Sequence, residues 1–328
     1  MSLNSKWKSG FLKTGLPLEY VTSNILNKIG YINMDEYPYI RPNESEELKE
    51  FSVDIRAYKT LESNNRSINL EMLVECKYRQ PGTSWIFSPL RNEDIAVGLV
   101  QSTEDLVPVR LNGSDTMWNF EDSIGYCTSG IELNSNGEGN TYGSRHGVFQ
   151  LRFAMPVLLK ELFQNTLNHN FFNGRSIDLL CAVLVTTSEL RVIKYGLDLE
   201  DFVNASNIDD VTEVREAIIL NENPGPQLQE FSDSIADELL GKYPELQKRL
   251  SYISSVLDGD EWRSRSAPDV DTIKRSFGYS TERILIVNYN FFEKIIKELE
   301  VAITENIQKE KVYGKIIGEK DKISVLKV

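Results

Sequence analysis

The chain has 328 residues, of which 41% are hydrophobic and 26% charged, enough for one large globular domain or two modest ones. Its net charge of −13 counts against a broad nucleic-acid-binding surface, although not against a local groove. The three cysteines are too widely scattered for a disulfide framework or a CxxC zinc pair, and two histidines exclude HExxH zinc sites and two-histidine nuclease motifs.

The sequence lacks the signals for membrane insertion and secretion, and it lacks a nucleotide-binding loop. No apolar run approaches the roughly 20 residues that span a bilayer, and the N-terminal residues lack the apolar core of a secretory signal. We therefore expect a cytoplasmic protein without membrane association. There is no Walker A sequence, and the GEGNTYG segment (137–143) has the wrong glycine spacing for a phosphate-binding loop, so we expect a solvated hairpin or mobile loop there.

The first elements are a helix and three strands. Residues 15–31 predict a helix with Pro17 in its first turn and a stop at Gly30. Residues 31–42 predict a strand, followed by a charged turn. Two further strands, 51–59 and 70–79, are joined by a polar loop.

The middle of the chain begins with a short strand at 84–87 and an insert at about 88–144, in which 106–111 and 130–134 are plausible strands. Residues 146–167 predict a long helix, bent at Pro156. Strands follow at 177–187, apolar enough to be buried on both faces, and at 189–195.

A Pro-, Gly- and Asn-rich segment, 221–227, is the best boundary candidate. We therefore predict one domain over 1–222 and a mostly helical region over 223–328, suited to dimerisation or partner docking. That region contains a predicted strand at 283–292 between two helical stretches. The element order predicts an α/β (α+β) fold, with a mixed central sheet flanked by helices.

The strands at 51–59 and 70–79 carry the most informative pattern, because apolar and polar side chains alternate in both. In the first, Asp54 lies on the polar side. In the second, Glu75 and Lys77 share the polar side. If the two strands are neighbours, these three side chains meet on one solvated polar face.

This pattern resembles the PD-(D/E)xK nuclease superfamily, whose fold is called restriction-endonuclease-like. Asp54 within SVDIRA matches the first acidic position, and Glu75-Cys76-Lys77 matches the (D/E)xK triplet. Val53 replaces the usual proline. The resemblance covers roughly residues 11–195, and it implies a Mg²⁺-dependent endonuclease acting on DNA, of a restriction or anti-phage defence type.

The resemblance also implies roles for the matching residues. Asp54 and Glu75 would hold Mg²⁺ or a substituting Mn²⁺, together with the backbone carbonyl of Cys76. Lys77 would orient or deprotonate the attacking water. Glu19, in the opening helix, matches an auxiliary acidic residue of many members.

Three further residues are candidate phosphate contacts: Arg79 on the second strand, and Gln150 and Arg152 at the start of the long helix. Surface or capping roles are the alternative for Gln150 and Arg152. For Asp54, Glu75 and Lys77 the alternative is an ordinary solvated strand face, because an ExK triplet alone occurs readily by chance.

Two other functions stay open at this point. The chain could be an inert nuclease-fold subunit that serves binding or assembly, or a nuclease that cuts RNA. Because cutting two strands usually needs two active sites, we also expect a homodimer. A partner protein that supplies sensing or ATPase function is a further expectation.

Overall fold

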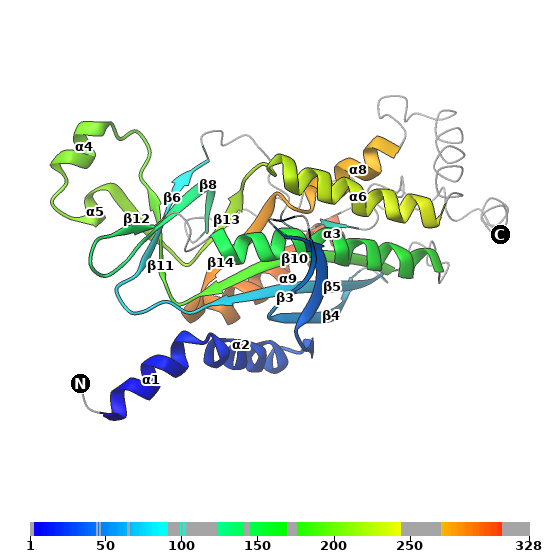
Figure 1. Ribbon diagram of the computed structural model, residues 1–328, viewed down its shortest axis with the longest axis horizontal. Helices are drawn as coiled ribbons and strands as arrows, with labels where there is room; N and C mark the ends of the chain where they lie inside the picture. The colour runs from blue at the N-terminus through cyan, green and yellow to red at the C-terminus, as the bar shows by residue number, and fades with distance from the viewer. Residues whose placement is uncertain are drawn as a thin grey trace.

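The computed structural model describes residues 3–90, 99, 101–102, 124–140, 145–168, 176–243 and 270–309, apart from 44, 46, 64 and 65. The predicted class is confirmed, since a large mixed sheet is flanked by helices (Figure 1). Twelve strands of the described chain form this sheet in the order β1-β4-β5-β10-β14-β13-β8-β6-β11-β12, with β7 beside β10 and β9 beside β8.

The sheet strands are β1 (Ile32–Met34), β4 (Ile55–Ser63), β5 (Arg66–Lys77), β6 (Ser84–Pro89), β7 (Gln101–Ser102), β8 (Ile124–Leu133), β9 (Gly139–Asn140), β10 (Ser176–Thr186), β11 (Glu189–Ile193), β12 (Thr212–Arg215), β13 (Ala217–Asn221) and β14 (Arg283–Asn288). A separate two-stranded ribbon pairs β2 (Tyr37–Pro42) with β3 (Leu48–Val53).

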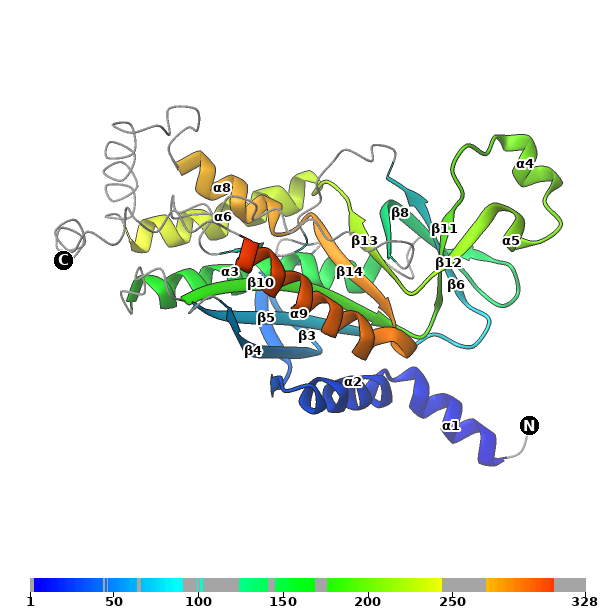
Figure 2. The ribbon, with the colours of Figure 1, turned by 180° about the vertical axis from the view of Figure 1, so that it is seen from behind.

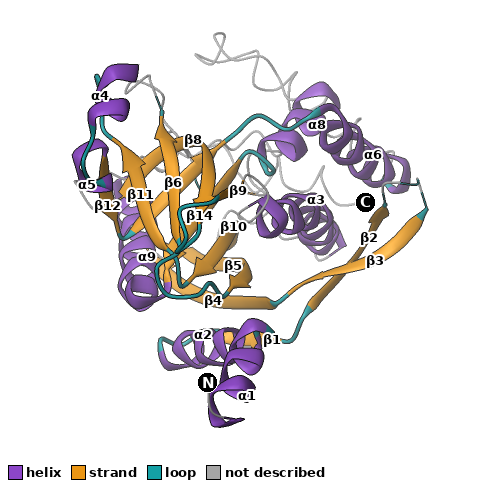
Figure 3. Ribbon diagram, turned by 60° about the vertical axis from the view of Figure 1, so that its left-hand side comes forward, coloured by secondary structure: helices purple, strands orange, loops and turns teal. Residues whose placement is uncertain are grey.

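The helices of the described chain are α1 (Leu3–Lys13), α2 (Leu16–Lys28), α3 (Arg145–Asn168), α4 (Leu199–Asn204), α5 (Ile208–Val211), α6 (Pro226–Lys242), α8 (Val270–Tyr279) and α9 (Phe292–Lys309), with a 3₁₀ turn, η2 (Tyr289–Phe291), before α9. Helices α3, α6 and α8 lie on one face of the sheet, and α2 and α9 lie on the other (Figures 2 and 3).

Each face of the sheet has its own hydrophobic core. Leu158 of α3, Leu239 of α6 and Phe277 of α8 are buried in the first core. Leu26 of α2 and Ile296 of α9 are buried in the second. The central strand β10 contributes to both cores, which confirms the prediction that it is buried on both sides.

The other predicted elements are largely confirmed. The expected helices correspond to α2, α3 and α9, and the expected strands at 84–87, 189–195 and 283–292 correspond to β6, β11 and β14. Residues 130–133 belong to β8, which forms a hairpin with β9 over the start of the 137–143 segment. The strand expected at 106–111 lies outside the described residues.

Two predicted strands are each divided between two sheets. Residues 31–42 form β1 in the main sheet and β2 in the ribbon, and residues 51–59 form β3 in the ribbon and β4 in the main sheet. The chain changes sheets at a single bent residue, Asp54, in the second case. One bent residue preserves the alternation of side chains, so the sequence pattern does not reveal the change.

The predicted boundary near residue 222 does not separate two cores. Strand β14 lies between β10 and β13, in the middle of the sheet. Helices α6 and α8 pack in the first core and α9 in the second. A Pro- and Gly-rich segment therefore marks only the turn from β13 into α6, and the described parts of 223–328 complete the sheet that the earlier residues begin.

Candidate active site

Antiparallel pairing of β4 with β5 places Asp54 beside Glu75. Ile55 pairs with Val74, so the preceding residue, Asp54, lies next to the residue that follows Val74. The bend at Asp54 turns its carboxylate toward β5, where Oδ2 accepts a hydrogen bond from the backbone N–H of Cys76 at 2.7 Å. Two carboxylates remote in sequence thus meet at the carboxyl end of β5.

Lys77 joins this pair from the same strand. Its ammonium forms an ion pair with Glu75 Oε1. It also donates a hydrogen bond to Gln150 Oε1 on α3 at 3.2 Å. The amide of Gln150 donates in turn to the backbone carbonyl of Ser52 at 3.0 Å. Gln150 therefore links α3, β3 and the lysine, a positioning role that the sequence did not indicate.

The first turn of α3 covers this group closely. A Cβ atom added at Gly147 would lie 2.9 Å from both Lys77 Cε and Leu184 Cδ1, so only glycine allows the helix to approach the lysine at this distance. The predicted solvated face is consequently wrong for Glu75, whose side chain is fully buried. Lys77 keeps 19% of its side chain exposed.

Burial makes the two carboxylates unusually basic. Desolvation, together with the nearby charge of Asp54, raises the pKa of Glu75 to about 8, against the opposing effect of Lys77. Desolvation also raises the pKa of Asp54, while the Cys76 N–H and Lys77 oppose the rise. Neighbouring carboxylates whose pKa values are both raised are typical of functional sites.

Two more glutamates lie within electrostatic reach. The pKa of Glu19 on α2 is raised by burial and by the charges of Asp54 and Glu36, and lowered by Lys77. Glu36 also raises the pKa of Asp54. It accepts a hydrogen bond from the Ser52 hydroxyl at the point where the chain leaves the main sheet. Glu36 is not among the residues predicted from the sequence, because its proximity to Asp54 depends on the two sheet changes.

The donors present fit a hard divalent cation. Glu75 Oε2 is buried and has no hydrogen-bond partner among the described residues, so one carboxylate oxygen is available for a ligand. No group of three or more His, Cys, Asp or Glu side chains in the described chain forms a ready metal cluster. Mg²⁺ does not require one, because it commonly binds through one or two carboxylates and retains several waters.

Of the other predicted phosphate contacts, Arg152 does not lie at the site and Arg79 is bound to another side chain. Arg152 is 2% exposed and bonds the carbonyl oxygens of Glu222 and Glu282 at 3.1 and 3.4 Å, so the structure does not bring it to the site. Arg79 Nε donates to Glu132 Oε2 at 2.6 Å. Cys76 lies at the site through its backbone, and the predicted role of its carbonyl oxygen stays a prediction.

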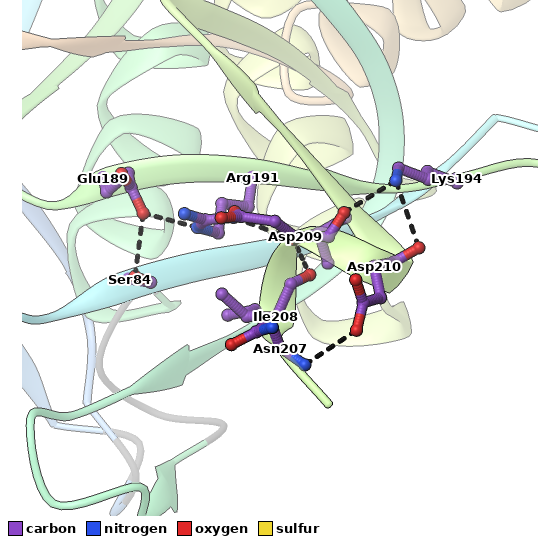
Figure 4. Close-up of polar contacts among 9 residues, drawn as sticks. Ser84, Glu189, Arg191, Lys194, Asn207, Ile208, Asp209 and Asp210 are labelled. Carbon is purple, nitrogen blue, oxygen red and sulfur yellow. Dashed lines mark hydrogen bonds and ion pairs between the residues drawn. The ribbon is translucent and has the colours of Figure 1, made fainter. Parts of the chain in front are cut away.

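A second polar cluster lies at the other end of the sheet, between β11 and α5 (Figure 4). Arg191 pairs with Glu189 and with Asp209, whose Oδ1 lies 2.5 Å from Nη1. Lys194 donates to the carbonyl oxygens of Asp209 and Asp210 at 2.6 and 3.1 Å. These charges satisfy one another, and we interpret the cluster as a clamp that holds α5 against the sheet.

Comparisons with known proteins do not assign the chain to a family. A scan against protein-family models, a search of curated proteins and a search of solved structures each found no match. Among the helices of the described chain, none is both long and apolar enough to cross a membrane.

Proposed function

We propose that the site formed by Asp54, Glu75 and Lys77 hydrolyses phosphodiester bonds in DNA with the help of Mg²⁺. The observation that supports this most is the meeting of two carboxylates of raised pKa with one ammonium, around a buried glutamate oxygen that has no partner among the described residues. The resemblance of SVDIRA and ECK to PD-(D/E)xK nucleases points to the same chemistry.

Asp54 and Glu75 would hold the cation, and a bound Mg²⁺ would neutralise negative charge on the phosphate. Lys77 can orient or deprotonate the attacking water, and its ammonium can stabilise charge that develops on the phosphate oxygens. Gln150 keeps that ammonium beside Glu75 through its 3.2 Å contact. Glu75 takes part only as a carboxylate, so protons and the cation compete for it.

Lys77 variants test the assignment directly. Lys77→Arg keeps a cation beside Glu75, but a guanidinium cannot give up a proton, so nicking of supercoiled plasmid in Mg²⁺ should fall at least about 100-fold with little change in melting temperature. Lys77→Met should abolish nicking and also lower the melting temperature, because it leaves the buried Glu75 without its partner.

Parallel reactions separate this proposal from its rivals. Wild-type protein should nick the plasmid in Mg²⁺ and not in EDTA, whereas Asp54→Asn should not nick in either. If the protein cut a labelled RNA and did not cut DNA, its substrate would be RNA. Cutting unaffected by Lys77→Arg and Asp54→Asn, or no cutting of either nucleic acid together with no calorimetric Mg²⁺ binding, would refute the hydrolytic site and favour an inert binding module.

A further inference from the structure

Helix α1 has a charge opposite to that of the rest of the protein. The first 18 residues contain three lysines, Lys6, Lys8 and Lys13, and no aspartate or glutamate. The remainder of the chain has 33 Lys and Arg against 49 Asp and Glu. A basic segment on a protein of net charge −13 is a local attraction for polyanions that the overall composition conceals.

These lysines are also available to a ligand. Lys6, Lys8 and Lys13 are exposed, and none pairs with a carboxylate of the described residues. Other lysines of the described chain form ion pairs, such as Lys28 with Glu293 at 2.8 Å and Lys59 with Glu300 at 2.7 Å.

Large aromatic side chains lie on the same helix. Trp7 is 63% exposed and Phe11 is 48% exposed, although both would normally be buried in a folded protein. They are four residues apart and therefore neighbours on the helix surface, with ring centroids 6.5 Å apart. Tyr20, on the following helix, is 67% exposed. Exposed rings interleaved with lysines are the combination that binds unpaired nucleic-acid strands, since bases stack on the rings and lysines contact the phosphates.

The C-terminal end of α1 adjoins α2, which carries Glu19, and the rest of α1 extends away from the sheet (Figures 1 and 2). A turn at Thr14 and Gly15, with φ +85° at the glycine, joins α1 to α2. The Glu19 carboxylate folds back over this turn, with Oε1 3.0 Å from where a Cβ of Gly15 would lie. Glu19 in turn shares the electrostatic field of Asp54 and Lys77.

We propose that α1 binds an unpaired stretch of the DNA substrate and leads it to the site of Asp54 and Glu75. The assignment rests on the proposed function for its choice of DNA. At 1.5 Å per residue, α1 is about 16 Å long, enough to follow a few consecutive nucleotides. The substrate class is then DNA with single-stranded character next to the cleaved bond, such as a frayed end or a flap.

Binding can be measured without cleavage. The full chain is titrated in EDTA into fluorescein-labelled single-stranded DNA, and into blunt duplex of the same length, with anisotropy as the signal. Wild type should prefer the single strand. Trp7→Ala/Phe11→Ala should weaken single-strand binding on the order of tenfold or more, because the variant removes both rings on which bases would stack. Tyr279→Ala, which removes an exposed aromatic from α8, is the matched control and should bind as wild type.

The lysines are tested by the salt dependence. Lys6→Gln/Lys8→Gln/Lys13→Gln should reduce the slope of log K against log salt by about 2, at roughly 0.7 per phosphate contact on a single strand. Lys274→Gln/Lys294→Gln/Lys297→Gln removes the same charge from α8 and α9 and should leave the slope unchanged. Equal binding of duplex and single strand, or unchanged affinity and slope in the α1 variants, would overturn the proposal.

Other occupants of α1 give distinct results. Loss of binding to anionic phospholipid vesicles in the α1 variants, with DNA binding intact, would overturn the proposal in favour of a lipid surface. Loss of a dimer by light scattering, with DNA binding intact, would overturn it in favour of a second copy. Single-strand binding through α1 without any Mg²⁺-dependent cutting would refute the proposed hydrolysis and leave the α1 assignment standing. If the α1 variants bound DNA with wild-type affinity and still cut it, the α1 assignment would be refuted and the proposed hydrolysis would stand.

Discussion

At the scale of single residues, the burial and raised pKa of Glu75 are the most distinctive properties of the site. Strand alternation is enough to predict that Asp54, Glu75 and Lys77 face the same way, and the structure brings the three together. Strand alternation does not predict that Glu75 is buried, because the residues that cover the site, Gly147 and Gln150, lie on a helix some 70 residues further along the chain. The raised pKa of Glu75 follows from that cover and not from the local sequence.

The pH dependence of stability should report the buried Glu75. Its pKa is about 8 in the folded protein and 4.5 in the unfolded chain, so between these values only the folded state keeps the proton. The free energy of unfolding should therefore fall as pH rises from about 5 to about 8, by roughly 1.4 kcal/mol per pH unit from this group, and level off above.

Urea denaturation in EDTA at several pH values measures this effect. Glu75→Gln keeps the shape and removes the titrating group, so its advantage over wild type should grow from pH 5 to pH 8. Parallel pH profiles for the two proteins would show that Glu75 titrates near its ordinary value.

At the scale of elements, the helices were easier to predict than the strand boundaries. Pro17 and Gly30 define the ends of α2 in the sequence as well as in the structure. The transfer of the chain between sheets at Asp54 could not be predicted, because the register continues and only the pairing partner changes. The same transfers bring Glu36 close to Asp54, which explains why this glutamate was missed.

The contact of α3 with β5 should tolerate no extra atom at Gly147. In Gly147→Ala the new methyl group would meet Lys77 and Leu184 at 2.9 Å, so either the helix start or the lysine must move. We expect a loss of about 1–3 kcal/mol in unfolding free energy and a fall in Mg²⁺-dependent nicking.

Gly241→Ala provides the control, because nothing lies within 4 Å of the added Cβ. It should stabilise the protein by about 0.5–1 kcal/mol through the better helix propensity of alanine and leave nicking unchanged. If Gly147→Ala behaved like Gly241→Ala in both measurements, the close approach of α3 to Lys77 would be wrong.

At the scale of the whole molecule, the described residues form one large sheet with a core on each face, beside the small β2–β3 ribbon. A boundary near residue 222 is a reasonable prediction because Pro and Gly concentrate there, but composition cannot show that β14 returns to the middle of the sheet. Arg152 reinforces the return, because it bonds the carbonyl oxygens of Glu222 and Glu282 at the neighbouring ends of β13 and β14. Arg152 therefore has a structural role, which is to connect the ends of β13 and β14.

A fragment of residues 1–222 should fail to fold. Without β14, strands β10 and β13 lose the strand that lies between them, the first core loses α6 and α8, and the second core loses α9. We expect the fragment to show no cooperative thermal transition by circular dichroism under conditions in which the full chain melts sharply. A sigmoidal melt with native-like near-ultraviolet signal would restore the predicted boundary.

The most direct measurement of the central claim is the position of a divalent cation. Crystals grown with Mn²⁺ and recorded at an anomalous wavelength locate the ion independently of any assumption about function. We expect one strong anomalous peak within coordination distance of the Asp54 and Glu75 carboxylates, beside Lys77, and no such peak in Asp54→Asn. Strong peaks only at other positions, or none at saturating Mn²⁺, would contradict the account of this site as a metal-dependent phosphodiesterase.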